Sequence, residues 1–195
     1  MNICYGIKNS HEPNFFKPFY NFFSEKSSKQ HFVVLNHIEA PALLKSLGFQ
    51  YKIIGKNYGG NFAKKALGLV INDFNYILQT PPFDVSITHG NTYLIHASKF
   101  MNKPTISFTD NDLYHLNHKL YFPLVDYLIT PDKIPLERLI HDGAVKENIV
   151  QFNGLKEELY IANYEPDTSF LSNLPFNEYI VLRPEARTAS YLKHE

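Results

Sequence analysis

The chain has 195 residues, of which 44% are hydrophobic and 19% charged, a composition typical of a folded globular protein rather than a disordered one. Nineteen basic residues balance nineteen acidic ones, so the charge indicates neither a nucleic acid nor a membrane surface as a partner. The single cysteine, Cys4, cannot form an internal disulfide. No integral membrane segment, signal peptide or transit peptide is seen, which predicts a cytoplasmic protein.

Short apolar runs alternate with helical patterns from the first residues onward. Strands are predicted at Asn2–Ile7, His31–Leu35, Tyr51–Ile54, Val85–Thr88, Thr105–Phe108, Tyr127–Thr130 and Ile149–Phe152. Helices are predicted to start near Asn14 and to cover Ala40–Leu47, Phe62–Leu78, Tyr93–Met101, Leu113–Tyr121 and Leu136–His141. Strands and helices alternating at this spacing predict a Rossmann-like three-layer α/β/α sandwich with a mostly parallel sheet of about seven strands.

Two of the predicted helices carry apolar residues along one side, and the aromatic side of the first is expected to pack on the sheet. The first has aromatic residues at three- and four-residue spacing, namely Phe15, Phe16, Phe19, Phe22 and Phe23. Pro18 is expected near its first turn, because a proline deeper in a helix removes a hydrogen bond. The long helix has one apolar side made of Ala66, Leu69, Val70, Phe74 and Ile77.

The sequence after residue 164 has a different pattern from the alternating strands and helices before it. Glu165–Pro175 is polar and interrupted by prolines, as in a linker, and Tyr179–Arg183 has the pattern of a buried strand. We therefore expect an amino-terminal Rossmann-like domain over residues 1–164 and a linker over 165–178. Residues 179–195 are then the truncated start of a second Rossmann-like domain.

Polar residues follow two neighbouring predicted strands. His89-Gly90-Asn91 comes after Val85–Thr88, at the carboxyl edge of the sheet, where open α/β sheets bind ligands. His89 and Asn91 can hydrogen-bond a sugar or phosphate oxygen, and Gly90 permits a close backbone approach or a positive φ. The alternative is a structural turn in which Asn91 or Thr92 caps the next helix. A ligand role is the favoured interpretation of this loop.

Asp110-Asn111-Asp112 follows the strand Thr105–Phe108 and should face the same crevice. Asp110 can orient a hydroxyl or act as a base, with Asn111 beside it as a further binding residue. Asp112 fits a helix cap better.

Two other loops are candidates for ligand binding. Asn9-Ser10-His11 precedes a helix amino-terminus, where backbone amides favour an anion, although it lacks a Gly-x-Gly-x-x-Gly pattern. Ligand loop and structural turn both stay open for it. Lys56, followed by Gly59-Gly60, can close over a ligand as a flap, but an ordinary loop is the slightly favoured interpretation.

A metal site is not predicted. Asp112, His115 and His118 are three residues apart and share one helical face. Three ligands from one helix rarely close a tetrahedral site, and no cysteine assists them. A solvated or sheet-capping face is the favoured interpretation.

Four motifs resemble a family of archaeal and bacterial proteins, domain-of-unknown-function family 354. They are Asn14-Phe15-Phe16-Lys17-Pro18, Ile54-Gly55-Lys56 with Gly59-Gly60, Asn153-Gly154-Leu155-Lys156-Glu157, and Arg183-Pro184-Glu185 with Ala189-Ser190-Tyr191-Leu192. The resemblance runs from end to end. It implies the GT-B superfamily, with its nucleotide-sugar glycosyltransferases and UDP-N-acetylglucosamine 2-epimerase.

The resemblance implies an amino-terminal GT-B half, on the acceptor side of a glycosyltransferase-like enzyme, whose carboxyl-terminal domain is missing here. The implied partners are a nucleotide-sugar or a sugar acceptor, with no cofactor and no catalytic metal. His89 or Asp110 is then the candidate base, and Arg183 and Glu185 would line the cleft at the hinge. The chain alone is expected to be inactive.

Two loops of the chain depart from the patterns that this resemblance implies. The loop Ser10-His11-Glu12-Pro13 differs from the usual family pattern. The sugar epimerases have His-Gly-Asp where this chain has His89-Gly90-Asn91, and an asparagine cannot take a proton as a carboxylate does. This weakens an epimerase-like function and leaves, as the other alternative, a non-catalytic Rossmann-like binding or scaffold domain.

Overall fold

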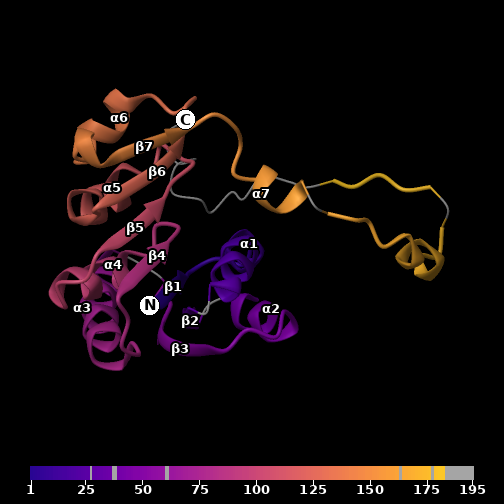
Figure 1. Cartoon of the computed structure of the whole chain (residues 1–195), viewed down its shortest axis with the longest axis horizontal. Helices are drawn as coiled ribbons and strands as arrows, with labels where there is room; N and C mark the ends of the chain where they lie inside the picture. Colours follow the sequence, from indigo (N-terminus) through magenta and orange to yellow (C-terminus); the bar gives the residue numbers. More distant parts are fainter. Residues whose placement is uncertain (27, 37–38, 60–61, 163, 177, 183–195) are drawn as a thin grey trace.

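A computed structural model describes residues 1–26, 28–36, 39–59, 62–162, 164–176 and 178–182, with the side chain of Phe62 left out. It contains one parallel sheet of seven strands in the order β3-β2-β1-β4-β5-β6-β7 (Figure 1). The strands are β1 (Asn2–Ile7), β2 (Lys29–Asn36), β3 (Tyr51–Lys56), β4 (Val85–Thr88), β5 (Thr105–Phe108), β6 (Tyr127–Pro131) and β7 (Ile149–Phe152). The predicted fold class and strand count are confirmed.

Helices follow the strands in alternation. They are α1 (Glu12–Glu25), α2 (Ala40–Ser46), α3 (Phe62–Gln79), α4 (Thr92–Phe100), α5 (His115–Tyr121), α6 (Leu136–His141) and α7 (Glu158–Ile161). Short 3-10 turns lie at Phe122–Leu124, Lys146–Asn148 and Thr168–Asn173.

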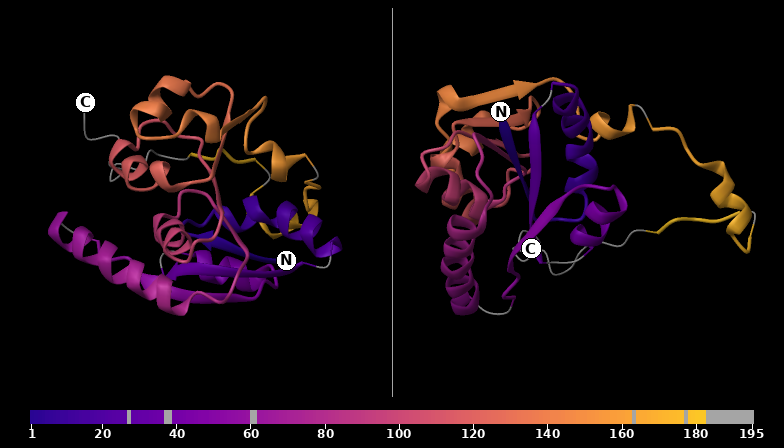
Figure 2. Two further views of the ribbon diagram at one scale, coloured as in Figure 1. Left: turned by 60° about the vertical axis from the view of Figure 1, so that its left-hand side comes forward. Right: turned by 60° about the horizontal axis from the view of Figure 1, so that its bottom comes forward.

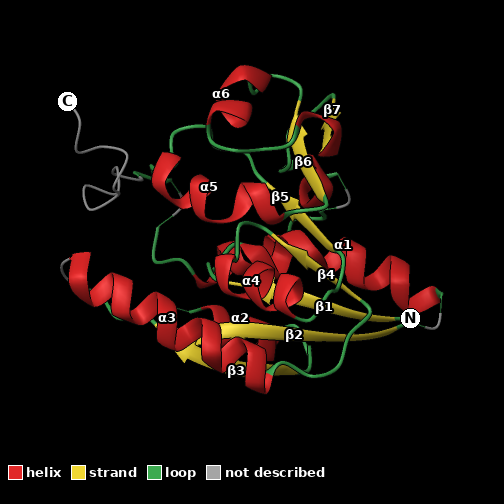
Figure 3. Cartoon of the chain, turned by 90° about the vertical axis from the view of Figure 1, so that its left-hand side faces the viewer, coloured by secondary structure: helices red, strands yellow, loops and turns green. Residues whose placement is uncertain are grey.

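The sheet lies between two helical layers (Figures 2 and 3). Side chains alternate along each strand, so neighbours in β1 pack on opposite layers. Tyr5 packs with Phe15 and Phe16 of α1, whereas Cys4 packs with Tyr76 of α3 and Leu94 of α4. A third cluster joins α4, α5 and α6 over β6. The continuous apolar strands therefore reflect burial on both faces, as in other parallel sheets.

The aromatic helix differs from its prediction in two ways. α1 begins at Glu12, and Pro18 lies inside the helix, beyond its first turn. The fold tolerates this proline because Asn14, whose carbonyl loses its helical partner, is exposed to water. Phe15 and Phe16 are fully buried, but Phe22 is 53% exposed and lies under the ammonium of Lys26.

The apolar side seen in the sequence of α3 is only partly buried. Val70 and Phe74 are exposed, and the helix instead turns Asn72 and Tyr76 inward. The amide of Asn72 accepts from the backbone N–H of Lys56 at 3.2 Å and donates to its carbonyl at 2.9 Å. These two hydrogen bonds join α3 to the end of β3, a contact that apolar spacing alone could not reveal.

The last described segment extends away from the sheet as an arm (Figure 2). The expected strand at Tyr179–Arg183 is absent from its described part, Tyr179–Leu182, which has no regular structure. Ile180, Val181 and Leu182 are 77–88% exposed. With no neighbouring strand to pair with, an apolar run of strand type cannot form one.

Candidate functional site

The order of the strands changes direction between β1 and β4. These two strands are hydrogen-bonded neighbours, yet the helix that follows β1 lies on one face of the sheet and the helix that follows β4 lies on the other. The loops after them therefore diverge at the carboxyl edge, the position where open α/β sheets bind ligands, and we call this position the crevice. Residues 8–11 follow β1 and residues 89–91 follow β4 at this position.

His89 occupies the centre of this position. Its side chain is 11% exposed, and its ring lies edge-on to Phe15 and to His11, with centroids 5.5 Å and 5.6 Å away. The Nε2 atom is 3.4 Å from Oδ1 of Asp110. Nε2 is buried and makes no direct hydrogen bond within the described residues, so its contact with Asp110 is an ion-pair contact only. The predicted convergence of His89 and Asp110 is present in the structure.

Asp110 also forms an ion pair with Lys156, whose side chain is only 14% exposed. Burial alone would raise the pKa of the Asp110 carboxyl, but its contacts with His89 and Lys156 outweigh burial and hold the pKa well below its usual range. Asp110 is therefore a carboxylate at neutral pH. A carboxylate stabilised in this way is a weak base.

Lys156 was not among the predicted site residues. It lies in the turn between β7 and α7, and Tyr160 of α7 packs against the core beside α1. The chain thus leaves the edge strand β7 and crosses to α1 (Figure 1), which delivers the ammonium to Asp110. The segment Asn153–Glu157 was noted only as a resemblance motif. No local pattern revealed that a lysine after the edge strand reaches the centre of the sheet.

Glu12 is the second residue that the sequence interpretation missed. It is the first residue of α1 and is fully buried. Its Oε2 accepts from the backbone N–H of Lys8 at 2.6 Å, and its Oε1 accepts from Nδ2 of Asn9 at 2.7 Å. Burial raises the pKa of Glu12 against the opposing influence of His89 and these hydrogen bonds. Because the helix was predicted to start at Asn14, Glu12 was interpreted as a loop residue.

His11, Glu12 and His89 offer ligand atoms that all lie within 4.8 Å of one another. This is the group of side chains at the crevice that could hold a cation. The predicted loop Asn9-Ser10-His11 thus contributes to the site in two ways. Asn9 holds Glu12, and His11 packs against His89.

Gly90 and Asn91 point into the protein. Gly90 has φ +68°, and a Cβ there would meet the hydroxyl of Tyr121 at 3.1 Å. The Asn91 side chain is fully buried and caps α4, accepting from Leu94 N–H at 3.2 Å. It donates to the Ile7 carbonyl at 3.3 Å and to Tyr76 Oη at 3.4 Å. The cap alternative for Asn91 and the positive φ of Gly90 are confirmed.

Asn111 and Asp112, in the loop after β5, have different structural roles. The side chain of Asn111 accepts from the backbone N–H of Leu113 at 2.7 Å, which closes a local turn. The prediction that Asp112 caps a helix is wrong. Tyr114 precedes α5 without a side-chain cap, and Asp112 instead forms an ion pair with Arg138 of α6.

The remaining predicted residues lie apart from this cluster. Lys56 ends the edge strand β3, two strands from β1, with its ammonium 5.2 Å from the ring centroid of Tyr58. Ser10 lies in the turn before α1. Arg183 and Glu185 are outside the described residues, as is the motif Ala189–Leu192. Two hollows of about 230 Å³ each, one beside Lys103 and Asp126 and one beside His31 and Tyr51, lie at the opposite, amino-terminal edge.

The model of the family described as "Protein of unknown function (DUF354)" matches residues 1–195. The chain belongs to this family. No curated protein matches it by sequence. Among the helices of the described residues, none combines the length and the apolar character needed to cross a bilayer.

The fold of this DUF354 chain is similar to solved GT-B structures. UDP-GlcNAc 2-epimerase from Neisseria meningitidis, solved bound to UDP-GlcNAc, has a TM-score of 0.60 at 12% identity, over 82% of this chain and 47% of that one. The enzyme of the same name from Methanocaldococcus jannaschii has a TM-score of 0.57 at 14% identity, over 77% and 45%. Anabaena Alr3699/HepE, in complex with UDP, also has 0.57 at 12% identity, over 80% and 44%. The chain thus spans about half the length of these structures.

Proposed function

We propose that the chain forms the acceptor-side half of a glycosyltransferase-like GT-B enzyme that acts with a nucleotide-sugar. One observation carries the proposal. A largely buried imidazole, that of His89, lies beside the carboxyl groups of Asp110 and Glu12 at the position where the strand order reverses. The similar folds include enzymes solved with UDP or UDP-GlcNAc, which supports a sugar nucleotide as the donor.

Of the two candidate bases, His89 fits better than Asp110. The lowered pKa of Asp110 makes it a poor proton acceptor at neutral pH, whereas it is well suited to orient His89 and to stabilise its protonated form. In the proposed step, an acceptor oxygen forms a bond to the anomeric carbon of the donor, and the bond to the nucleoside diphosphate breaks. The acceptor hydroxyl proton passes to His89. Lys156 keeps Asp110 ionised.

The described chain supplies one wall of such a cleft. The other wall is proposed to be a second domain, for which residues 179–195 are the start and to which Arg183 and Glu185 belong. The length of the similar structures, about twice that of this chain, supports this division. GT-B enzymes mostly hold the nucleotide in the carboxyl-terminal domain, so the 195 residues alone should transfer no sugar. Transfer by this chain alone would contradict the proposal.

Two alternatives differ in class. An epimerase-like enzyme is disfavoured, because Asn91 is buried as a helix cap and cannot exchange a proton. A non-catalytic binding or scaffold domain requires no charged cluster at the crevice. It is less consistent with an ion pair, Asp110–Lys156, assembled from two distant parts of the chain.

The test uses the product of the complete gene and its melting temperature with UDP, UDP-GlcNAc and UDP-glucose. We expect at least one of these ligands to raise the melting temperature, since a ligand that binds only the folded state stabilises it. For a responding sugar nucleotide, sugar transfer to an acceptor should be lost in His89→Ala and fall at least tenfold in Asp110→Asn. His31→Ala, on the opposite edge of the sheet, is the control and should behave as wild type. No response to any of the three ligands would favour the scaffold alternative.

A further inference from the structure

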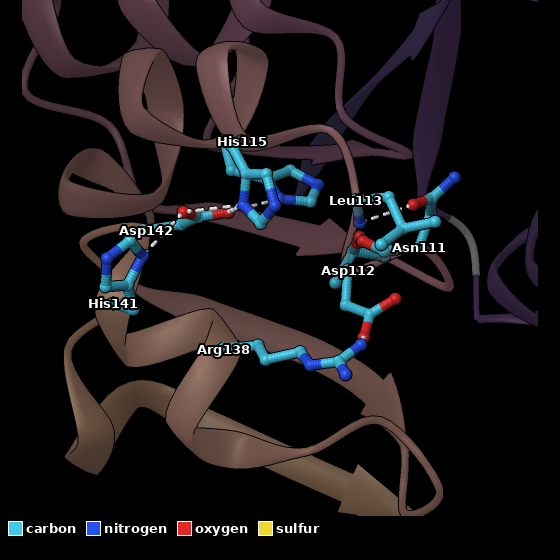
Figure 4. A network of polar contacts seen from close by, with 9 residues as sticks. Asn111, Asp112, Leu113, His115, Arg138, His141 and Asp142 are labelled. Carbon is cyan, nitrogen blue, oxygen red and sulfur yellow. Dashed lines mark hydrogen bonds and ion pairs between the residues drawn. The ribbon is translucent and has the colours of Figure 1, made fainter. Parts of the chain in front are cut away.

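A second polar cluster lies between α5 and α6, outside the crevice (Figure 4). Three imidazoles converge through Nδ1 on the carboxylate of Asp142. His115 lies 2.9 Å from Oδ2 and 3.0 Å from Oδ1, His118 lies 3.0 Å from Oδ2, and His141 lies 3.3 Å from Oδ1. The residues come from two separate helices and the turn that ends the second. They are therefore brought together by the fold rather than by sequence proximity alone.

The charge of Asp142 has no permanent counterpart in the described part of the chain. Its side chain is 1% exposed, and within the described residues it forms ion-pair contacts with the three histidines. Arg138, one turn earlier in α6, points instead to Asp112 (Figure 4). A buried carboxylate is costly unless a cation or several hydrogen bonds compensate it. A divalent cation supplies that compensation with a positive charge that does not depend on the histidines.

The distances match a coordination sphere. Metal–ligand distances of about 2.0–2.1 Å in a tetrahedral zinc site separate the ligand atoms by about 3.3 Å. The Asp142 oxygens lie 2.9–3.3 Å from the His115 and His141 nitrogens, and the ligand atoms of these three residues lie within 4.8 Å of one another. His115 and His141 have side chains 53% and 71% exposed, so small rotations can close the remaining gap.

His118 has a different position from the other two imidazoles. It is 2% exposed, and its ring stacks on Phe122 at a centroid distance of 4.2 Å with a 10° angle. This packing fixes the Nδ1–H that faces Oδ2 of Asp142. A ligating carboxylate is commonly oriented by such a hydrogen bond to its other oxygen. His118 is therefore a positioning residue.

We propose that His115, His141 and Asp142 bind a divalent transition-metal ion of the zinc type, with a fourth coordination position open to solvent. Imidazole and carboxylate are suitable ligands for zinc, and the exposed Nε2 atoms of His115 and His141 can keep their protons in water. Asp112, three residues before His115, is not a ligand, because it pairs with Arg138. The site therefore takes ligands from α5 and from the end of α6, which removes the objection that one helix cannot enclose a metal.

The experiment titrates the purified, metal-free chain with Zn²⁺ by calorimetry and with Co²⁺ by visible absorption. We expect one ion per chain and a Co²⁺ spectrum of four- or five-coordinate type. The double variant His115→Asn/His141→Asn should weaken Zn²⁺ binding at least 100-fold. Both side chains are more than half exposed, so the variant should fold. His118→Gln should weaken binding about 10–100-fold, as expected for an orienting group.

The controls separate this site from the other candidate group. His11→Asn removes a member of the His11–Glu12–His89 group and should leave the affinity for Zn²⁺ unchanged. His31→Asn, far from both groups, should also bind as wild type. Absence of Zn²⁺ binding by the wild-type chain would overturn the proposal. So would binding that survives the His115→Asn/His141→Asn change or that is lost in His11→Asn.

Discussion

At the crevice, single residues divide into those that are ionisable and those that hold the backbone. His89, Asp110, Lys156 and Glu12 form the ionisable set, whereas Gly90 and Asn91, only one and two residues after His89, are structural. The ionisable groups converge at the carboxyl edge of the sheet, whereas Asn91 is enclosed by β1, α3 and α4.

Loss of the Lys156 ammonium should destabilise the fold in a pH-dependent way. In Lys156→Met, Asp110 keeps its burial but loses its closest cation, so the free energy of unfolding at pH 7 should fall by about 1–3 kcal/mol. The folded pKa of Asp110 lies below its ordinary value of 3.8. The stabilisation is therefore complete above that value and is lost as the pH falls from 3.8 through the folded pKa. Urea unfolding at pH 7 and pH 3 measures this loss.

Lys133→Met is the matched control for that variant. Lys133 also pairs with an aspartate, but its side chain is 79% exposed. Its removal should change the unfolding free energy by less than about 0.5 kcal/mol. An equal effect of the two substitutions would contradict a specific role for the Asp110–Lys156 pair.

Asn91→Asp should destabilise the protein, although aspartate caps helices as well as asparagine does. The new carboxylate could still accept from Leu94 N–H, but it could not donate to the carbonyl of Ile7. A buried charge would then face a carbonyl oxygen. We expect a loss of about 2–4 kcal/mol, measured by urea unfolding at pH 7. Wild-type stability in this variant would mean that the site accommodates the carboxylate of the epimerase pattern.

The sequence predicted which residues would converge better than it predicted their roles. His89 and Asp110 were paired correctly, because the carboxyl ends of neighbouring parallel strands must lie together. Glu12 and Lys156 could not be found in this way. Placing Glu12 in the site requires knowing where α1 starts. Placing Lys156 there requires knowing that the chain crosses from the edge strand β7 to α1. Both are tertiary facts that short-range patterns do not contain.

At the scale of elements, His96 joins three helices. Its Nδ1 lies 2.9 Å from the Asp73 carboxylate of α3, and its Nε2 lies 2.9 Å from the Leu120 carbonyl of α5. Both partners are acceptors, so both ring nitrogens must donate, and the ring must be protonated to satisfy them. Burial lowers the pKa of His96, but the bonds to Asp73 and Leu120 outweigh burial and raise it above 6.5.

The junction of α3, α4 and α5 should therefore weaken as the pH rises. A raised folded pKa means that the contribution of His96 is fully present below about pH 6.5 and is lost as the pH rises through the folded pKa. His96→Gln keeps one donor, so it should reduce the unfolding free energy by about 1–3 kcal/mol at pH 5.5 and by less at pH 9. Asp73→Asn should remove the same pH dependence. A difference between wild type and His96→Gln that is equal at both pH values would contradict a protonated ring.

The elements themselves were largely predictable, and their orientation was not. Strands such as β1 (Asn2–Ile7) and β2 (Lys29–Asn36) stand out because burial on both faces gives them apolar runs. Helix faces are harder to predict, because polar contacts can override apolar spacing. Asn72 of α3 is bonded to both backbone groups of Lys56, whereas Phe74 of the same helix faces outward.

At the scale of the whole molecule, the sheet and its two helical layers form one unit, and the arm after α7 does not belong to it (Figure 1). The arm exposes large apolar side chains, including Phe170, Phe176 and Tyr179, each 50–60% exposed. Exposed apolar side chains concentrated in one segment indicate a surface that another domain or partner covers. This agrees with the expectation that a second domain begins beyond residue 178.

Limited chymotrypsin digestion should test this division of the chain. Exposed aromatic residues of the sheet unit, such as Phe22 and Phe74, lie within long helices, whereas the arm has little regular structure. The first cuts should therefore fall between Phe170 and Tyr179, and the amino-terminal product should keep the melting temperature of the intact chain. Trypsin is the control, because residues 165–182 contain no lysine or arginine and the arm should survive it. If the complete gene encodes a second domain, its presence should slow cleavage at Phe170–Tyr179 at least tenfold. Equal cleavage rates with and without that domain would contradict the expectation that the arm enters it, because pairing with its strands would remove these side chains from the protease.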